Sequence, residues 1–179
     1  MKSEKDIAII YNRYVDDLYT YGVYLGFENE IVKDAIHDLF LKFSTDNTLV
    51  SGISNIRFYL FKSLKNRLYD LFKNKKEQVG LSDVDQNAVF PFQFTVTVED
   101  HYIDDETRRL IQKQIEEMLD SLTDRQREIV YLRYIQEYDY PQISQLLGIS
   151  IHGCRKLLSR AMQELRNKYG VLLILFTLA

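Results

Sequence analysis

The side chains with the clearest chemical potential lie on one face of a helix expected over residues 151–168. At about 100° per residue, the face opposite an apolar stripe collects hydrogen-bond donors. Arginine and lysine bond phosphates or guanine edges, and glutamine pairs with adenine, so this face predicts contact with duplex DNA. The residues are His152, Lys156, Ser159 and Gln163, flanked by Arg155 and Arg160.

A second polar face lies on a helix expected over residues 56–76. Basic side chains recur there at steps of three and four, together with one amide and one phenol. Such a face can follow a phosphate backbone while the amide and the phenol meet bases. The alternative is a solvated lysine face, which is common on helices. The residues are Lys62, Lys65, Asn66, Tyr69 and Lys73.

Other chemistry has little support in the sequence. It contains no glycine-rich phosphate loop, no nucleophile elbow and no His/Cys/Asp/Glu group with metal-ligand spacing. The single cysteine, Cys154, falls on the apolar stripe of its helix, which indicates a buried, inert thiol. We therefore expect a protein that is not an enzyme, with no cofactor, no metal and no small-molecule substrate.

Charge is segregated along the chain. The net charge is only −3, but residues 57–76 carry +6 and residues 77–123 carry −8. The segments 1–56 and 124–179 carry −4 and +3. Two basic segments separated by an acidic one predict two anion-binding surfaces on one chain.

The elements that would position these faces are helices. Two prolines and seven glycines in 179 residues are too few for the turns of an all-β protein. Apolar residues recur with a helical period over 7–25, 28–43, 56–76, 106–122 and 124–136. Thr123 is the expected N-cap of the last of these. Leu110, Ile115, Ile129, Leu132 and Ile135 belong to the expected apolar stripes.

Residues 140–169 have the pattern of a helix-turn-helix. Pro141 suits the first turn of a short helix, Gly148 suits a C-cap with positive φ, and Ser150 suits the N-cap of the next helix. The alternative is a basic helical hairpin that packs on a partner. The apolar stripe of the second helix consists of Cys154, Leu158, Ala161 and Leu165.

No stretch of the sequence predicts membrane insertion. A bilayer-spanning helix needs about 20 apolar residues, and the apolar tail 171–179 is far shorter. The charged start of the chain lacks the apolar core of a signal peptide. Together with the lone cysteine, these features indicate the cytoplasm.

At these motifs the sequence resembles the sigma-70 family, in its extracytoplasmic-function group. Residues 119–128, 140–150 and 159–166 are similar to the family's region 4. Asp34, Asp38, Leu39 and Phe40 resemble its region 2.2, and residues 58–76 resemble regions 2.3 and 2.4. Asn66 and Asp70 stand in the places of the family's Asn and Asp.

The resemblance implies an all-α fold of two small helical domains joined by an acidic linker. A region 2-like bundle would occupy residues 1–77 and bind core polymerase and the −10 element. The linker would cover 78–109. A region 4-like helix-turn-helix domain would occupy 110–169 and bind the −35 element, followed by an apolar tail over 170–179.

The resemblance also implies partners and roles. Asp34, Asp38 and Phe40 would bind the β′ subunit of core RNA polymerase. The face from Lys62 to Lys73 would hold the melted single strand of the −10 element. The face from His152 to Gln163 would read the −35 duplex. The β subunit, promoter DNA and an anti-sigma factor complete the implied partners, and polymerase performs the chemistry.

Two features depart from the family pattern. Gly153 and Leu157 replace a polar and a basic residue that are common in the family's recognition helix, which bears on the promoter sequence and not on the fold. The apolar tail lies outside the motifs, and it either packs on the C-terminal domain or docks on a partner.

Two other function classes fit parts of the sequence. An operator-binding regulator would explain residues 140–168 but not the basic helix 56–76, and an adaptor protein would leave both basic faces solvated. A sigma factor would bind core polymerase, a regulator would bind duplex DNA alone, and an adaptor would bind neither.

Overall fold

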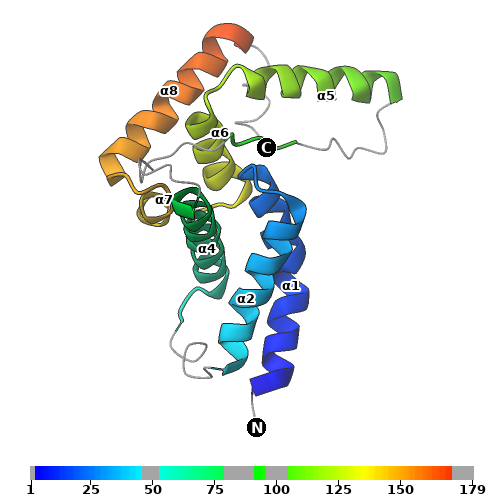
Figure 1. The fold of residues 1–179 in the computed structure, drawn as a ribbon. Helices are drawn as coiled ribbons and strands as arrows, with labels where there is room; N and C mark the ends of the chain where they lie inside the picture. Colours follow the sequence, from blue (N-terminus) through cyan, green and yellow to red (C-terminus); the bar gives the residue numbers. More distant parts are fainter. Residues whose placement is uncertain (1–2, 46–52, 79–90, 96–104, 171–179) are drawn as a thin grey trace. The chain divides into compact units, whose positions relative to one another are not determined.

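The computed structural model describes residues 3–45, 53–78, 91–95 and 105–170, and all of their regular structure is helical (Figure 1). The chain divides into two compact units, Met1–Pro91 and Phe92–Ala179. The all-α fold expected from the sequence is confirmed. The elements are α1 (Ser3–Tyr24), α2 (Asn29–Thr45), α4 (Ile56–Gln78), α5 (Asp105–Asp120), α6 (Asp124–Val130), a π-helix (Tyr131–Ile135), α7 (Tyr140–Leu147) and α8 (Ile151–Tyr169).

Unit 1 is a bundle of α1, α2 and α4, which run side by side in alternating directions (Figure 1). The apolar stripe of α4 turns inward, and Leu60, Leu64 and Leu68 have no exposed surface. Tyr21 of α1 packs on Phe61 of α4 with ring centroids 5.0 Å apart. This core fixes which sides of α2 and α4 face outward.

α1 and α2 approach each other closely at a glycine. A Cβ atom built on Gly22 would lie 2.6 Å from Cγ1 of Val32, and Val32 is fully buried. Real Cβ atoms do not come this close to a neighbour, and the β-branched valine has little rotamer freedom to move away. Gly22 therefore sets the distance between the two helices.

Unit 2 contains the helix-turn-helix, and its local signals are confirmed. Gly148 ends α7 in the left-handed conformation, with φ of 64°. The side chain of Ser150 accepts a hydrogen bond from the Gly153 N–H and caps α8. Thr123 caps α6 through a capping box with Gln126. An unexpected second capping box, formed by Asp139 and Gln142, starts α7.

The prediction of one continuous α-helix over 124–136 is wrong in its second half. α6 ends at Val130 and the chain continues as a π-helix, in which the Gln136 N–H donates to the Tyr131 carbonyl oxygen at 3.0 Å. Ile135, expected in the apolar stripe, is 49% exposed because the wider turn changes its direction. Leu110 of α5 is 58% exposed, also against expectation.

The expected linker 78–109 contains structure that its sequence pattern does not predict. α4 includes Gln78, and α5 begins at Asp105, inside the expected linker. Phe92 and Phe94 are 1% and 8% exposed and belong to the core of unit 2. The apolar tail, apart from Gly170, lies outside the described residues. No helix in the described part of the chain has the length and apolarity needed to cross a bilayer.

Replacing Gly22 with alanine should destabilise unit 1, because the new methyl group overlaps Val32. We expect the free energy of unfolding to fall by about 1–3 kcal/mol, the usual range for overpacking. Urea unfolding followed by far-UV circular dichroism measures the change. The matched control is Gly153→Ala, whose nearest neighbour is the Ser150 Oγ at 3.3 Å. This variant should be neutral or stabilised by up to about 1 kcal/mol, so equal losses in both variants would contradict the argument.

Candidate nucleic-acid interface

The polar face of α8 is built by the burial of its opposite side. Cys154 and Ala161 have no exposed surface, and Leu158 and Leu165 are 6% and 5% exposed. Burial raises the pKa of the Cys154 thiol, so the neutral form expected from the sequence is favoured. With this stripe inward, all six predicted DNA-contacting side chains of α8 are exposed: His152, Arg155, Lys156, Ser159, Arg160 and Gln163.

Two arginines flank an aromatic ring at the start of this face. The guanidinium carbons of Arg133 and Arg155 each lie 5.4 Å from the centroid of the Tyr140 ring. Arg133 also donates from Nη1 to the Tyr138 carbonyl oxygen at 3.0 Å, which holds the guanidinium in place. Stacked guanidiniums keep further donors free to bond phosphate oxygens. We call Arg133, Tyr140 and Arg155 the arginine–tyrosine cluster.

Sequence reasoning found only one member of this cluster. A continuous α-helix over 124–136 gives no reason to bring Arg133 next to Tyr140, and the π-helix changes the direction of its last residues. Tyr140 begins α7 directly after the capping residue Asp139, but its ring has no sequence signal of its own.

The second predicted face, on α4, is only partly at the surface. Asn66 and Lys73 are exposed, and Lys62 and Tyr69 are half-buried. Lys65 was expected on the exposed polar face of this helix, but it is only 7% exposed. Its ammonium nitrogen lies 5.5 Å from the centroid of the Tyr69 ring. Lys65 follows Phe61 by one helical turn and therefore turns toward the interior of unit 1.

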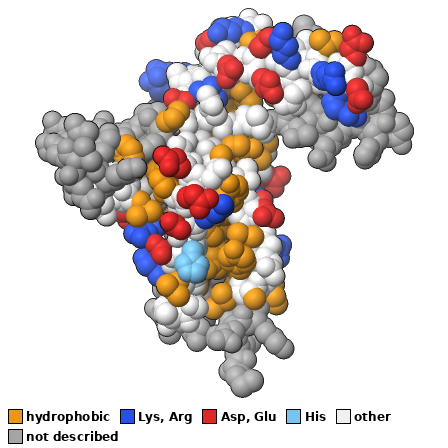
Figure 2. Space-filling model, turned by 45° about the vertical axis from the view of Figure 1, so that its right-hand side comes forward, with side chains coloured by type: hydrophobic (Ala, Val, Ile, Leu, Met, Phe, Trp, Pro, Cys, Tyr) orange, Lys and Arg blue, Asp and Glu red, His pale blue; other side chains and the backbone are white. Residues whose placement is uncertain are grey.

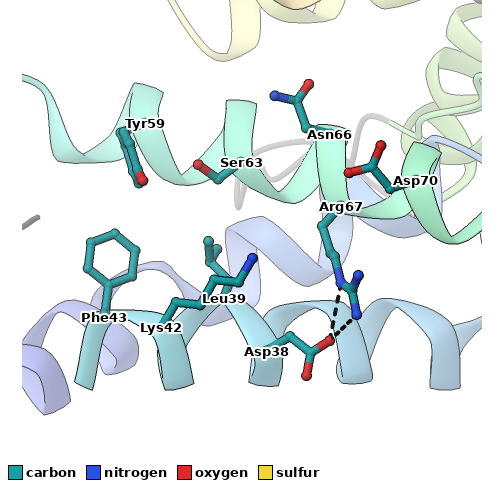
Figure 3. A pocket seen from close by; sticks show the side chains of 9 residues that line it. All are labelled: Asp38, Leu39, Lys42, Phe43, Tyr59, Ser63, Asn66, Arg67 and Asp70. Carbon is teal, nitrogen blue, oxygen red and sulfur yellow. Dashed lines mark hydrogen bonds and ion pairs between the residues drawn. The ribbon is translucent and has the colours of Figure 1, made fainter. Parts of the chain in front are cut away.

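A pocket of about 240 Å³ lies between α2 and α4 (Figure 3). Its α4 wall includes Asn66 and Asp70, the two residues that match the family's Asn and Asp. Tyr59 of α4 meets Phe43 of α2 edge to face, with ring centroids 5.5 Å apart. Polar and aromatic groups therefore line one concavity, with Lys42 and Ser63 completing the polar set.

One ion pair crosses this pocket. Arg67 of α4 donates to Oδ2 of Asp38 on α2 from Nε at 3.1 Å and from Nη2 at 2.5 Å (Figure 3). Both side chains keep more than a third of their surface exposed, so the pair contributes at most about 1 kcal/mol. Asp38 was expected to pair with polymerase, and within the chain it already has a partner.

The other two residues expected to bind polymerase differ from each other. Asp34 is exposed on α2, as the prediction requires. Phe40 was expected at the surface as a polymerase contact, but it is only 7% exposed. Its ring packs edge to face on that of Tyr11 of α1, with centroids 4.9 Å apart. Hydrophobic side chains do reach the surface of unit 1 (Figure 2). They are Ile9, Tyr11 and Leu41, at 64%, 40% and 53% exposure.

Residues 112–165 match the protein-family model described as Sigma-70, region 4. This span includes most of α5 and all six polar residues of the α8 face. The chain is also 24% identical over 166 residues to the ECF RNA polymerase sigma factor SigM of Bacillus subtilis, covering 90% of this chain and 93% of SigM. These similarities support a place for the chain in the extracytoplasmic-function group of the sigma-70 family.

Two more relatives are similar to the chain in sequence, and two solved structures are similar to it in fold. The RNA polymerase sigma factor YlaC of Bacillus subtilis is 24% identical over 93% of this chain and 94% of its own. The ferric citrate uptake sigma factor FecI of Escherichia coli is 29% identical over 77% and 78%. The fold of this chain resembles that of RpoE from Bartonella quintana, solved with the anti-sigma factor NepR (TM-score 0.58, 20% identity, 91% and 96% coverage). It also resembles CnrH, solved with the cytosolic domain of CnrY (TM-score 0.53, 17% identity, 95% and 91% coverage).

Proposed function

We propose that this protein is an RNA polymerase sigma factor, which binds core polymerase, recognises the −10 and −35 promoter elements and promotes strand opening. The observation that carries the proposal is the exposed polar face of α8 within a capped helix-turn-helix. No catalytic residue is required, because polymerase performs the chemistry, and the site of action is the cytoplasm.

The α8 face would enter the major groove of the −35 element. Its donors lie toward the N-terminal half of α8, the part that contacts base edges in helix-turn-helix proteins. The arginine–tyrosine cluster lies beside this half and is suited to the flanking phosphates, which position a protein without specifying sequence. Arg155 belongs to both sets, and so it would link phosphate contact to base reading.

The pocket between α2 and α4 would receive an unpaired base of the −10 element. Its volume of about 240 Å³ is below the range usual for drug-sized ligands, which suits one planar group. Tyr59 and Phe43 offer aromatic surface, and Asn66 offers both a donor and an acceptor. Stacking on an aromatic ring contributes about 1–3 kcal/mol per base, which helps offset the cost of strand opening. Lys62 and Lys73 would follow the backbone of the same strand.

Core polymerase would dock on the outer surface of α1 and α2. Asp34 supplies an exposed charge for the β′ subunit, and Ile9, Tyr11 and Leu41 supply exposed apolar surface. The β subunit is the proposed contact of unit 2. An anti-sigma factor is a further proposed partner, because RpoE and CnrH were solved with proteins of that kind or with the cytosolic domain of a partner.

Run-off transcription with core polymerase, with and without this protein, tests the proposal on genomic fragments from its host. We expect initiation at discrete sites only when the protein is present. Binding to duplex DNA without binding to core polymerase would contradict the sigma-factor proposal. That result would support an operator-binding regulator, a function for which unit 2 alone would suffice.

The α8 face provides a matched pair of lysine variants. Lys156→Ala should lower transcription from a −35-dependent promoter by roughly 5- to 150-fold, equivalent to about 1–3 kcal/mol for a lost DNA contact. The control, Lys168→Ala, removes an exposed lysine of the same helix that pairs with Glu164 at 3.1 Å. The control should retain activity, because Lys168 lies about 120° around the helix from Lys156. A loss of similar size in both variants would argue against base or phosphate contact by this face.

The pocket provides a matched pair of asparagine variants. Asn66→Ala should reduce the fraction of open complex by roughly 2- to 12-fold, as expected for one net hydrogen bond of about 0.5–1.5 kcal/mol. Permanganate reactivity of unpaired thymines near −10 measures that fraction. Asn74→Ala, an exposed position of the same helix, is the control and should leave it unchanged. Unchanged reactivity in Asn66→Ala would remove the pocket from the proposed strand-opening surface.

A further inference from the structure

We propose that Arg67 is a further contact for the single strand of the −10 element, and that Asp38 keeps it in an ion pair until core polymerase binds. The inference rests on the proposed function, and it gives Asp38 the role in polymerase binding that the sequence predicted. One ion pair would then link two events, so that the strand is bound well only when polymerase is present.

The two partners of the pair belong to different surfaces. Arg67 lies on α4 beside Asn66 and lines the pocket proposed to receive an unpaired base. Asp38 lies on α2, four residues after the exposed Asp34, so the two carboxylates are about 6 Å apart along one side of the helix. The Asp38 side chain is 40% exposed and within reach of a second protein. Asp38 therefore lies both at the pocket and beside the charge proposed to meet the β′ subunit.

The geometry of the pair leaves groups on both sides for other partners. Arg67 donates from Nε and from Nη2 to the same oxygen, Oδ2 of Asp38 (Figure 3). Oδ1 of Asp38 and Nη1 of Arg67 take no part in these bonds. A carboxylate accepts about four hydrogen bonds and a guanidinium donates five. A basic residue of polymerase can therefore bind Asp38 while Arg67 is still in place.

The pair is weak enough for such a partner to displace it. The side chains of Arg67 and Asp38 are 35% and 40% exposed, and a pair of this kind shifts an equilibrium by up to about 5-fold. A cation of polymerase at Asp38 would share the negative charge that holds Arg67 and would also repel the guanidinium. Polymerase would then favour the state in which Arg67 has left the pair.

The charges of the pocket explain why this matters for a nucleic acid. Its cationic side chains are Lys42 and Arg67, and its anionic side chains are Asp38 and Asp70. These charges balance, so the pocket of the free protein has no net attraction for a phosphate backbone. Neutralisation of Asp38 by polymerase leaves an excess positive charge, which favours the strand.

A released Arg67 stays at the pocket. It lies between Asn66 and Asp70 on α4, and all three residues line the same concavity. Its guanidinium can bond a phosphate with two donors or stack on a base, which an ammonium group does less well. Arg67 would therefore join Asn66 as a contact of the unpaired strand.

A purely structural pair is the alternative, in which Arg67 and Asp38 only join α2 and α4. Loss of either partner would then have the same effect on strand binding. In the proposed switch the two losses have opposite signs, because removal of Asp38 releases Arg67 and removal of Arg67 removes the contact.

Binding of a fluorescein-labelled single strand to the full-length protein tests the switch by fluorescence anisotropy. The strand carries the −10 region of a promoter identified by run-off transcription. Without polymerase, we expect Asp38→Asn to bind it roughly 2- to 5-fold more tightly than the parent protein, the range set by the loss of one exposed ion pair. A gain of affinity cannot come from loss of the fold. An unchanged or lower affinity in Asp38→Asn would overturn the proposal.

Glu30→Gln is the matched control. It also removes one negative charge from α2 and one exposed ion pair, that of Lys33 and Glu30 at 2.8 Å, but neither residue lines the pocket. We expect its affinity for the strand to equal that of the parent protein. A gain as large as that of Asp38→Asn would show a general effect of charge and would contradict the role of Arg67.

Arg67→Gln shows whether the released guanidinium makes the contact. It should weaken strand binding more in the Asp38→Asn protein than in the parent protein, because only there has Arg67 left the pair. Addition of core polymerase to the parent protein should enlarge the loss in the same way. Equal losses in all of these states would mean that the two charges act independently, and would overturn the proposal. If the parent protein starts no transcription with core polymerase, the proposed function is wrong and the inference falls with it.

Discussion

The burial of one apolar stripe on α8 is the constraint on which the candidate DNA surface depends. Cys154, Leu158, Ala161 and Leu165 point inward at steps of four, three and four, and every polar residue of the opposite face is thereby turned outward. The far end of the stripe packs on Met118 and Leu122 at the end of α5. The hydroxyl of Tyr169 donates to the Glu117 carbonyl oxygen, which fixes the same end by a polar contact. The orientation of the candidate DNA face thus comes from the core beneath it.

Unit 1 arranges its surface differently. Its core is held by leucines and aromatic rings, while its outer groove between α2 and α4 is crossed by a partly exposed ion pair. Such a pair adds little to stability, but it joins α2 and α4 across the pocket. The same groove carries Asn66 and Asp70, so the ion pair and the residues proposed to meet the −10 element share one concavity.

What the sequence predicted well follows local rules. Gly148, Ser150 and Thr123 occupy caps because turn and cap chemistry depends on a few neighbouring residues. The α8 face was predicted in full, because one strong period determines both sides of a helix. Lys65 and Phe40 were assigned to surfaces but are buried, since the face that a helix turns inward depends on its neighbours in space. Phe92, Phe94 and Arg133 were missed for the same reason, because their partners lie 30 or more residues away or beyond an irregular turn.

The π-helix has a consequence for how sequences of different length relate to this one. Its five residues, Tyr131–Ile135, make a turn that holds one residue more than an α-helical turn would. An α-helical turn in its place would hold one residue fewer, so a related chain that lacks one residue here can keep the segments on either side in register. Such a chain has one side chain fewer in the turn that places Arg133 beside Tyr140. A one-residue gap at this turn in an alignment therefore marks a change in the side chains beside the ring of Tyr140, even where α8 itself is identical.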